Sequence, residues 1–259
     1  MNPLLTENDP ALFDVINANG AAPLLVCCDH AGRGIPQSLG DLGLHEEFLQ
    51  LHIAYDIGAR QVALMLSQKF DAPLLLANYS RLVIDLNRHL DDATLIPEFS
   101  DKVAVPGNTG LLRWQRQQRV EEIFNPYHKQ YSEMVDRLRA RFVKPLILSV
   151  HSFTPEIDGV SRPWDFGVLW EEHYELAQIL IRNLGKNRKL FIGENRPYHA
   201  RDPLGYSMVV HAQERGVEMG LIEIRQDRIE QPDGQKWATE ILHQAVLPVL
   251  DHSQVQQVS

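Results

Sequence analysis

The chain of 259 residues contains only two cysteines and no long run of apolar residues. Cys27 and Cys28 are adjacent inside a short apolar segment, so a disulfide framework is implausible and buried, inert thiols are expected. No segment approaches the roughly 18–20 consecutive apolar residues that a membrane-spanning helix needs, and the first residues lack the pattern of a secretory signal. The sequence therefore predicts a cytoplasmic protein without a membrane partner.

An excess of positive charge is also lacking. The chain has 25 Lys and Arg residues against 34 Asp and Glu residues, which gives a formal net charge of -9. A surface that binds nucleic acid needs an excess of basic residues to neutralise phosphates, so no nucleic-acid partner is expected. A small anionic substrate stays compatible with this charge, because it needs only one or two local arginines.

Several common catalytic motifs are missing. The sequence has no CxxC pair, HExxH helix, Walker sequence or serine nucleophile elbow, which argues against the enzyme classes that these motifs mark. Cys27 and Cys28 could in principle hide a nucleophile, but their position inside an apolar strand points at least one of them away from solvent. A cysteine mechanism is therefore not expected.

Short apolar runs alternate with segments of helical periodicity. Several runs are almost continuously apolar, which is typical of strands covered on both faces by helices. The predicted strands are 23–28, 72–77, 82–86, 145–150, 165–170, 189–193 and 219–224. The predicted helices are 46–70, 112–142, 171–184, 207–215 and 234–250. With no Gly/Ser-rich or Pro-rich linker, this alternation predicts a single α/β domain over 1–259, with three αβα layers and a mixed, largely parallel sheet.

Two of the predicted strands end on a histidine. His30 follows the first apolar run and enters a Gly-rich loop, and His151 ends the run that begins at residue 145. A lone histidine after a strand is usually an ordinary loop residue, but open α/β sheets place their ligands at the carboxyl ends of strands. Two such histidines indicate a metal site, because imidazole is the commonest zinc ligand and catalytic zinc takes three protein ligands.

The third ligand is open at this point. Asp56 lies four residues after His52 and shares a helix face with it if the segment is helical. Asp56 could be the ligand, or it could cap a helix that begins at Ile57. His52 is an alternative ligand or an outer partner of the site.

Arginines and carboxylates complete the candidate site. Arg81 and Arg88 either pair with Asp85 and other carboxylates or face a pocket for an anion. Glu194 and Glu223 lie at the ends of apolar runs.

Glu223 is costly to bury unless it is paired or used, so it is the better candidate for a general base, although pairing with Arg225 is an alternative. Metal-assisted hydrolysis is the reaction class that uses all of these groups.

Six segments in order resemble the signature segments of the N-formylglutamate amidohydrolase family, over roughly residues 20–230. They are Asp29-His30-Ala31-Gly32 with Ile35-Pro36, His52-Ile53-Ala54-Tyr55-Asp56-Ile57-Gly58-Ala59, Ser80-Arg81 with Asp85-Leu86-Asn87-Arg88, His151-Ser152-Phe153-Thr154-Pro155, Gly193-Glu194-Asn195-Arg196-Pro197-Tyr198 and Ile222-Glu223-Ile224-Arg225-Gln226-Asp227. The family is in turn similar to zinc carboxypeptidases and aspartoacylases. This similarity implies a zinc carboxypeptidase-like fold with a mixed eight-stranded sheet.

The resemblance also implies roles for individual residues. It makes His30 and His151 zinc ligands, Glu223 the base that activates water, and Arg88 with Asn87 the group that binds the substrate carboxylate or polarised carbonyl. Arg81, Asn195 and Tyr198 are expected to contact the substrate. The carboxypeptidase relatives place a glutamate ligand three residues after the first histidine, where this chain has Arg33. We therefore expect Asp56 to be the third ligand, with Glu194 as the fallback.

The implied reaction is the zinc-dependent hydrolysis of N-formyl-L-glutamate or a similar N-acyl amino acid. It would use one zinc ion per chain and release formate, or another acid, and an amino acid. The alternatives are an N-acyl amino-acid deacylase or carboxypeptidase-like peptidase of other specificity, and a catalytically silent homologue that only binds. The sequence leaves the acyl group and the oligomeric state open.

Overall fold

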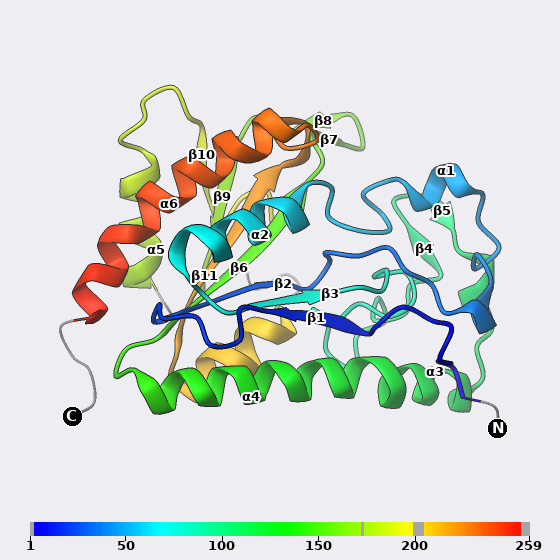
Figure 1. The fold of residues 1–259 in the computed structure, drawn as a ribbon. Coiled ribbons are helices and arrows are strands. Elements are labelled where there is room, and N and C mark those ends of the chain that lie inside the picture. The colour runs from blue at the N-terminus through cyan, green and yellow to red at the C-terminus, as the bar shows by residue number, and fades with distance from the viewer. Residues whose placement is uncertain (1–2, 172–173, 199–204, 255–259) are drawn as a thin grey trace.

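The centre of the protein is a seven-stranded sheet with the order β1-β3-β2-β6-β11-β9-β10 (Figure 1). The computed structural model describes residues 3–171, 174–198 and 205–254. The strands of this sheet are β1 Phe13–Ile16, β2 Leu24–Cys28, β3 Leu74–Ala77, β6 Leu146–Phe153, β9 Phe166–Leu169, β10 Ile192–Glu194 and β11 Glu218–Arg225. β3, β2, β6 and β11 run parallel to one another, whereas β1 and β9 pair antiparallel with β3 and β11. The predicted mixed, largely parallel sheet is confirmed.

One predicted strand is wrong. Residues 82–86 form turns, in which Val83 N donates to Ser80 O and Asp85 N donates to Leu95 O. Their apolar side chains are buried all the same, so the apolar run indicated burial correctly but could not specify the backbone conformation. The seventh strand is the edge strand β1, which is only half-buried and therefore shows no apolar run. The described sheet has one strand fewer than the eight implied by the resemblance.

Helices cover both faces of the sheet (Figure 1). One face carries α2 Ala59–Phe70, α5 Tyr174–Leu184 and α6 Pro232–Gln254. The other carries α4 Asn125–Arg141 and the π-helical turn η4 Met208–Ala212. The predicted three-layer arrangement is confirmed. None of the helices in these ranges has the length and apolar content needed to cross a membrane.

The predicted helix over 46–70 is interrupted. It divides into α1 Glu46–Leu49 and α2, with turns between them. Gly58 stands at the start of α2 with a φ of 79°, and a Cβ at this position would lie 2.3 Å from Ile229 O. Only glycine fits this close approach with a left-handed backbone. The break places Asp56 in a turn, where it is free to approach the ends of the strands.

The remaining elements are short or extend the helices already named. They are η1 Gln37–Leu39, β4 Phe99–Ser100, β5 Val103–Ala104, η2 Pro106–Asn108, α3 Arg113–Arg119, η3 Val120–Phe124, β7 Glu156–Ile157, β8 Val160–Ser161, η5 Gln213–Arg215 and η6 Gln226–Arg228. α3, η3 and α4 follow one another without a break and match the predicted helix over 112–142.

Alternate residues of the central strands pack against opposite helical layers. In β2, Cys27 belongs to the core on the α4 side and Cys28 to the core on the α2 side. Both thiols are free and fully buried, and burial raises their pKa, so they stay protonated. The structure therefore gives neither cysteine the properties of a nucleophile.

Candidate metal centre and active site

The candidate site lies at the carboxyl ends of the parallel strands. His30 comes two residues after β2, and His151 and Glu223 are paired neighbours in the register of β6 and β11. Strands that run parallel end at the same edge of a sheet, so residues from distant parts of the chain meet there. This arrangement explains why the polar residues that follow apolar runs in the sequence lie together.

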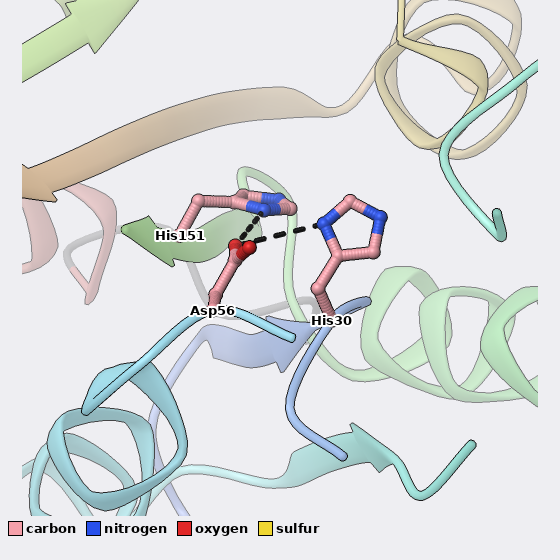
Figure 2. Close-up of side chains that lie close together, drawn as sticks. All are labelled: His30, Asp56 and His151. Carbon is pink, nitrogen blue, oxygen red and sulfur yellow. Dashed lines mark hydrogen bonds and ion pairs between the residues drawn. The ribbon is translucent and has the colours of Figure 1, made fainter. Parts of the chain in front are cut away.

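His30, Asp56 and His151 form one buried cluster, with the Asp56 carboxylate between the two imidazole rings (Figure 2). Asp56 Oδ2 is 3.5 Å from His30 Nδ1 and 2.9 Å from His151 Nδ1. Two ligands that are each about 2.1 Å from a tetrahedral zinc ion lie roughly 3.4 Å apart. The spacing of the three side chains therefore suits a metal ion.

The outer nitrogens of both rings are held by other residues. His30 Nε2 lies 2.7 Å from Asp85 Oδ1, and His151 Nε2 lies 3.0 Å from Ser149 Oγ. Metal-binding histidines are usually oriented in this way through the nitrogen that does not face the metal. His30 Nδ1 is buried without a hydrogen-bond partner. Two Nδ1 atoms and a carboxylate thus face one point, and this donor set fits zinc with an open coordination position.

The Asp56 carboxylate does not cap a helix, so that alternative is wrong. Helix α2 has Gly58 as its N-cap and no side-chain capping bond. Asp56 Oδ2 instead accepts a hydrogen bond from Ser152 N, and Asp56 Oδ1 lies 3.4 Å from Arg81 Nη1. Although burial opposes ionisation, the neighbouring histidines hold the pKa of Asp56 below its usual range. The positive charge that these histidines carry when protonated favours the ionised carboxylate, which is the form that binds a metal ion.

The two other candidates for the third ligand lie outside this cluster. His52 Nε2 is 3.2 Å from Asp101 Oδ2 near the surface. Glu194 is exposed and accepts a hydrogen bond from Gln178. Neither residue is among those that line the cavity next to the cluster.

A cavity of about 140 Å³ opens beside the three side chains. Its wall contains the two histidines and Asp56, a second carboxyl group, two arginines, three other polar side chains and an apolar patch. Apart from the cluster, the lining residues are Glu223, Arg81, Arg88, Asn87, Ser152, Tyr198, Leu169, Gly205, Met208 and Leu221. A mixture of apolar wall and a few convergent polar groups is typical of a small-molecule site.

The two arginines of the cavity differ in their pairing. Arg81 Nη2 and Nε donate to Asp85 Oδ2 at 2.8 and 3.2 Å, and Arg81 also contacts Asp56. Among the described residues, the Arg88 side chain donates to Asn87 O, and its Nε is buried without a partner. No carboxylate in the described ranges pairs with Arg88. The charge of Arg81 is therefore balanced within the protein, whereas the charge of Arg88 is available to an anionic ligand.

Glu223 is buried and has an oxygen, Oε2, without a hydrogen-bond partner. Burial raises the pKa of Glu223 to about 7, although the nearby His151 opposes this change. The alternative of an ion pair with Arg225 is wrong, because Arg225 Nε donates to Asp227 at 2.8 Å and no ion pair joins Arg225 to Glu223. A carboxyl group that titrates near neutral pH and lines the cavity has the properties of a general acid and base.

Comparison with known proteins identifies the family. A sequence model of the N-formylglutamate amidohydrolases matches residues 22–230, a range that contains every residue of the cluster and the cavity described above. The chain belongs to the N-formylglutamate amidohydrolase family.

Two N-formylglutamate deformylases are among its relatives. The one from Pseudomonas putida is 33% identical over 165 residues, which are 53% of this chain and 54% of the relative. The one from Pseudomonas aeruginosa is 29% identical over 155 residues, with the same two shares. The chain thus spans about half the length of the relatives it matches.

Two solved structures share the fold of this family member over most of its length. A gene product of Agrobacterium tumefaciens is 31% identical, with a TM-score of 0.89 and coverage of 95% of this chain and 99% of that one. The N-formylglutamate amidohydrolase from Ralstonia eutropha is 20% identical, with a TM-score of 0.71 and the same coverage. The second likeness concerns the fold alone.

Asn195 and Tyr198 come from one family segment but have different places in the structure. Tyr198 lines the cavity. Asn195 has a φ of 47° in a turn, and its Oδ1 accepts a hydrogen bond from Trp170 N at 2.9 Å. Asn195 is not among the residues that line the cavity, so its visible role is to hold the turn that leads to Tyr198.

Sequence reasoning did not predict the contacts of three groups near the site. Asp85 was considered only as a partner of the arginines, but it also contacts His30. Ser149 supports His151, and Asp29 accepts a hydrogen bond from Tyr127 on α4 at 2.6 Å. The alternation of side chains along β6, which puts Ser149 on the same face as His151, was the one available signal for Ser149.

Proposed function

We propose that this protein is a zinc-dependent amidohydrolase that removes the formyl group from N-formyl-L-glutamate, or the acyl group from a similar N-acyl amino acid. One observation carries the proposal. The cluster of His30, Asp56 and His151 shares its cavity with Glu223, a buried carboxyl group with an unpartnered oxygen. Family membership and the two deformylase relatives support the same reaction.

The cluster would hold the zinc ion through His30 Nδ1, His151 Nδ1 and the Asp56 carboxylate. A zinc ion in such a site acts as a Lewis acid, which makes water nucleophilic near neutral pH and polarises an acyl carbonyl. Asp85 and Ser149 keep the two rings in orientation through their Nε2 atoms.

Glu223 is positioned to move the proton. Its carboxylate accepts a proton from the water that attacks the acyl carbon, and then donates that proton to the leaving nitrogen as the C–N bond breaks. A pKa that burial raises toward neutrality suits both steps, because the group can be deprotonated before the attack and protonated after it. The products are formate, or another carboxylic acid, and the free amino acid.

Arg88 and Asn87 provide the site for the substrate carboxylate. Arg88 is the cavity arginine without an acidic partner within the described ranges, and a guanidinium group can bind a carboxylate through two parallel hydrogen bonds. The volume of about 140 Å³ is below the roughly 300–1,000 Å³ of pockets for drug-sized ligands, which favours a small substrate. The balanced Arg81 remains next to the cluster and can steady the oxyanion.

The experiment that tests this proposal is a screen of N-formyl and N-acetyl amino acids with the zinc-loaded protein, followed through the released amine. We expect the highest kcat/KM for an N-formyl amino acid with an acidic side chain. Preference for a larger acyl group or a peptide would instead favour a deacylase or peptidase of other specificity. A protein that binds no zinc and hydrolyses nothing even after zinc is added would be a silent homologue, and the proposal would be wrong.

A further inference from the structure

Arg162 is a buried arginine for which the described residues supply no acidic partner. It follows the short strand β8 and is only 8% exposed. Arginine is rarely buried unless it is paired or used, because its charge cannot be removed at ordinary pH. No carboxylate within the described ranges lies at ion-pair distance from Arg162, in contrast to Arg81, which is paired with two aspartates.

The side chain of Arg162 contacts Tyr198 in two ways. Arg162 Nη1 donates a hydrogen bond to Tyr198 Oη at 3.1 Å. The guanidinium carbon also lies 4.8 Å from the centroid of the Tyr198 ring, within the range of a cation–π interaction. One arginine therefore fixes both the ring and the hydroxyl oxygen of a residue that lines the cavity.

The main chain of Arg162 is held as well. Arg162 N donates to Pro155 O at 2.8 Å, and Arg162 O accepts a hydrogen bond from Arg225 Nη1 at 3.4 Å. Arg225 is itself held by Asp227 at 2.8 Å. The arginine is thus in place before a ligand binds. Ligand binding therefore does not have to include the entropic cost of ordering Arg162.

These contacts determine what the Tyr198 hydroxyl can do. A tyrosine hydroxyl has one hydrogen to donate and also accepts hydrogen bonds. Because Arg162 donates to the oxygen, the hydroxyl hydrogen remains for a group in the cavity. The pKa of Tyr198 is raised from its usual value, because desolvation and the nearby Glu223 outweigh the opposing effect of Arg162, so the hydroxyl keeps this hydrogen at neutral pH. A hydrogen bond accepted from a cation also strengthens the hydroxyl as a donor.

We propose that Arg162 is a positioning residue that turns the Tyr198 hydroxyl into a hydrogen-bond donor toward a negatively charged oxygen of the bound substrate. This inference rests on the proposed hydrolysis of an N-acyl amino acid. It extends the site to a residue on the β7–β8 side of the fold that does not line the cavity itself.

A double-mutant cycle with Arg162→Met and Tyr198→Phe tests this inference on zinc-loaded protein, with kcat and KM measured separately for the best N-acyl substrate. Methionine keeps an apolar stem but removes the charge and the donor, and phenylalanine removes only the hydroxyl. A hydrogen bond to a charged group is worth roughly tenfold to a hundredfold, so each single variant should lose about that much in kcat/KM. In the Tyr198→Phe background, Arg162→Met should cost less than about twofold further. Zinc content should stay at the parental value in all variants.

The outcomes separate the inference from the proposed function. Losses that multiply in the double variant, or an Arg162→Met variant with parental kcat/KM, would overturn the role of Arg162. A parent protein that hydrolyses no N-acyl amino acid would instead overturn the proposed function. If Arg162→Met does not fold, Arg162→Lys, which keeps the charge but not the planar guanidinium group, is used in the same cycle.

Arg141→Met is the matched control. Arg141 lies over the ring of Phe142 at 5.0 Å, but it stands at the end of α4, before the start of β6 and away from the cavity. Its replacement removes an arginine–aromatic contact of the same kind without reaching a hydroxyl group. It should leave kcat/KM within about twofold of the parent, as expected for a site far from the chemistry.

Discussion

Replacing Glu223 by glutamine separates a general base from a metal ligand and from a structural residue. Glu223→Gln keeps the shape of the side chain and removes its basicity. General acid–base catalysis typically contributes about 100-fold to 10,000-fold, so kcat should fall by that factor. KM and zinc content should change little, because in the proposed site Glu223 is not a zinc ligand and does not hold the substrate carboxylate.

The same substitution should not destabilise the protein. Burial raises the pKa of Glu223 from its usual 4.5 to about 7. A carboxyl group with a raised pKa in the folded state is destabilising once it ionises, so this cost develops as the pH rises from 4.5 through 7. At about 1.4 kcal/mol per pH unit, the cost reaches about 3 kcal/mol above pH 7 in the metal-free protein. Metal-free Glu223→Gln should therefore melt at or above the parental temperature at pH 8.

The assay follows kcat/KM from pH 5 to 9, together with metal analysis and thermal unfolding. The parental rate should rise with pH on an acidic limb, because the base must lose its proton, and this limb belongs to Glu223 and the activated water as a coupled pair. The glutamine variant should lose this limb. Retention of near-parental turnover with an unchanged acidic limb would refute the base assignment. Loss of zinc would make Glu223 a ligand, and a sharp fall in melting temperature with intact turnover would make it structural.

Three further predictions concern the metal and the substrate. His30→Ala and His151→Ala should each lose stoichiometric zinc and nearly all hydrolysis while remaining folded. His52→Ala, which lies outside the cluster, should keep its zinc in the same metal analysis. Retention of zinc by either cluster variant would contradict the proposed site. Asp56→Asn should weaken zinc binding by more than about tenfold in a chelator competition, because a neutral amide is a poor zinc ligand, and unchanged affinity would remove Asp56 from the ligand set. Arg88→Lys should lower kcat/KM by at least about tenfold, because lysine cannot bind a carboxylate through two parallel bonds, and the reasoning fails if the parent cleaves an uncharged amide analogue as fast as the acid.

The sequence predicted the layers of this fold because buried parallel strands are visible as apolar runs. The runs before His30 and His151 became β2 and β6. The prediction of a strand over 82–86 was wrong, because this apolar run is buried in turns. The backbone hydrogen bonds of these turns, such as the one from Asp85 N to Leu95 O, cannot be predicted from composition. Edge strand β1 was missed for the opposite reason, since a half-exposed strand of four residues carries no apolar run.

At the site, the types of residue at the strand ends predicted which side chains take part. The contacts between segments that are distant in the sequence could not be predicted. His30 and Asp85 are separated by 55 positions, and nothing in either segment indicates that they touch. Arg162 lies outside the six family segments, and its burial is visible only in the three-dimensional structure. Asn195 shows that membership of a family segment does not place a residue in the cavity, because its side chain stabilises the turn instead.

The metal content of the purified protein, measured together with its hydrolysis of N-formyl-L-glutamate before and after chelation, tests the proposed zinc site most directly. We predict one zinc ion per chain, loss of hydrolysis when that zinc is removed, and recovery in proportion to the zinc restored. Full hydrolysis by protein that has been shown to contain no metal would contradict the central claim that His30, Asp56 and His151 bind the zinc ion on which the reaction depends.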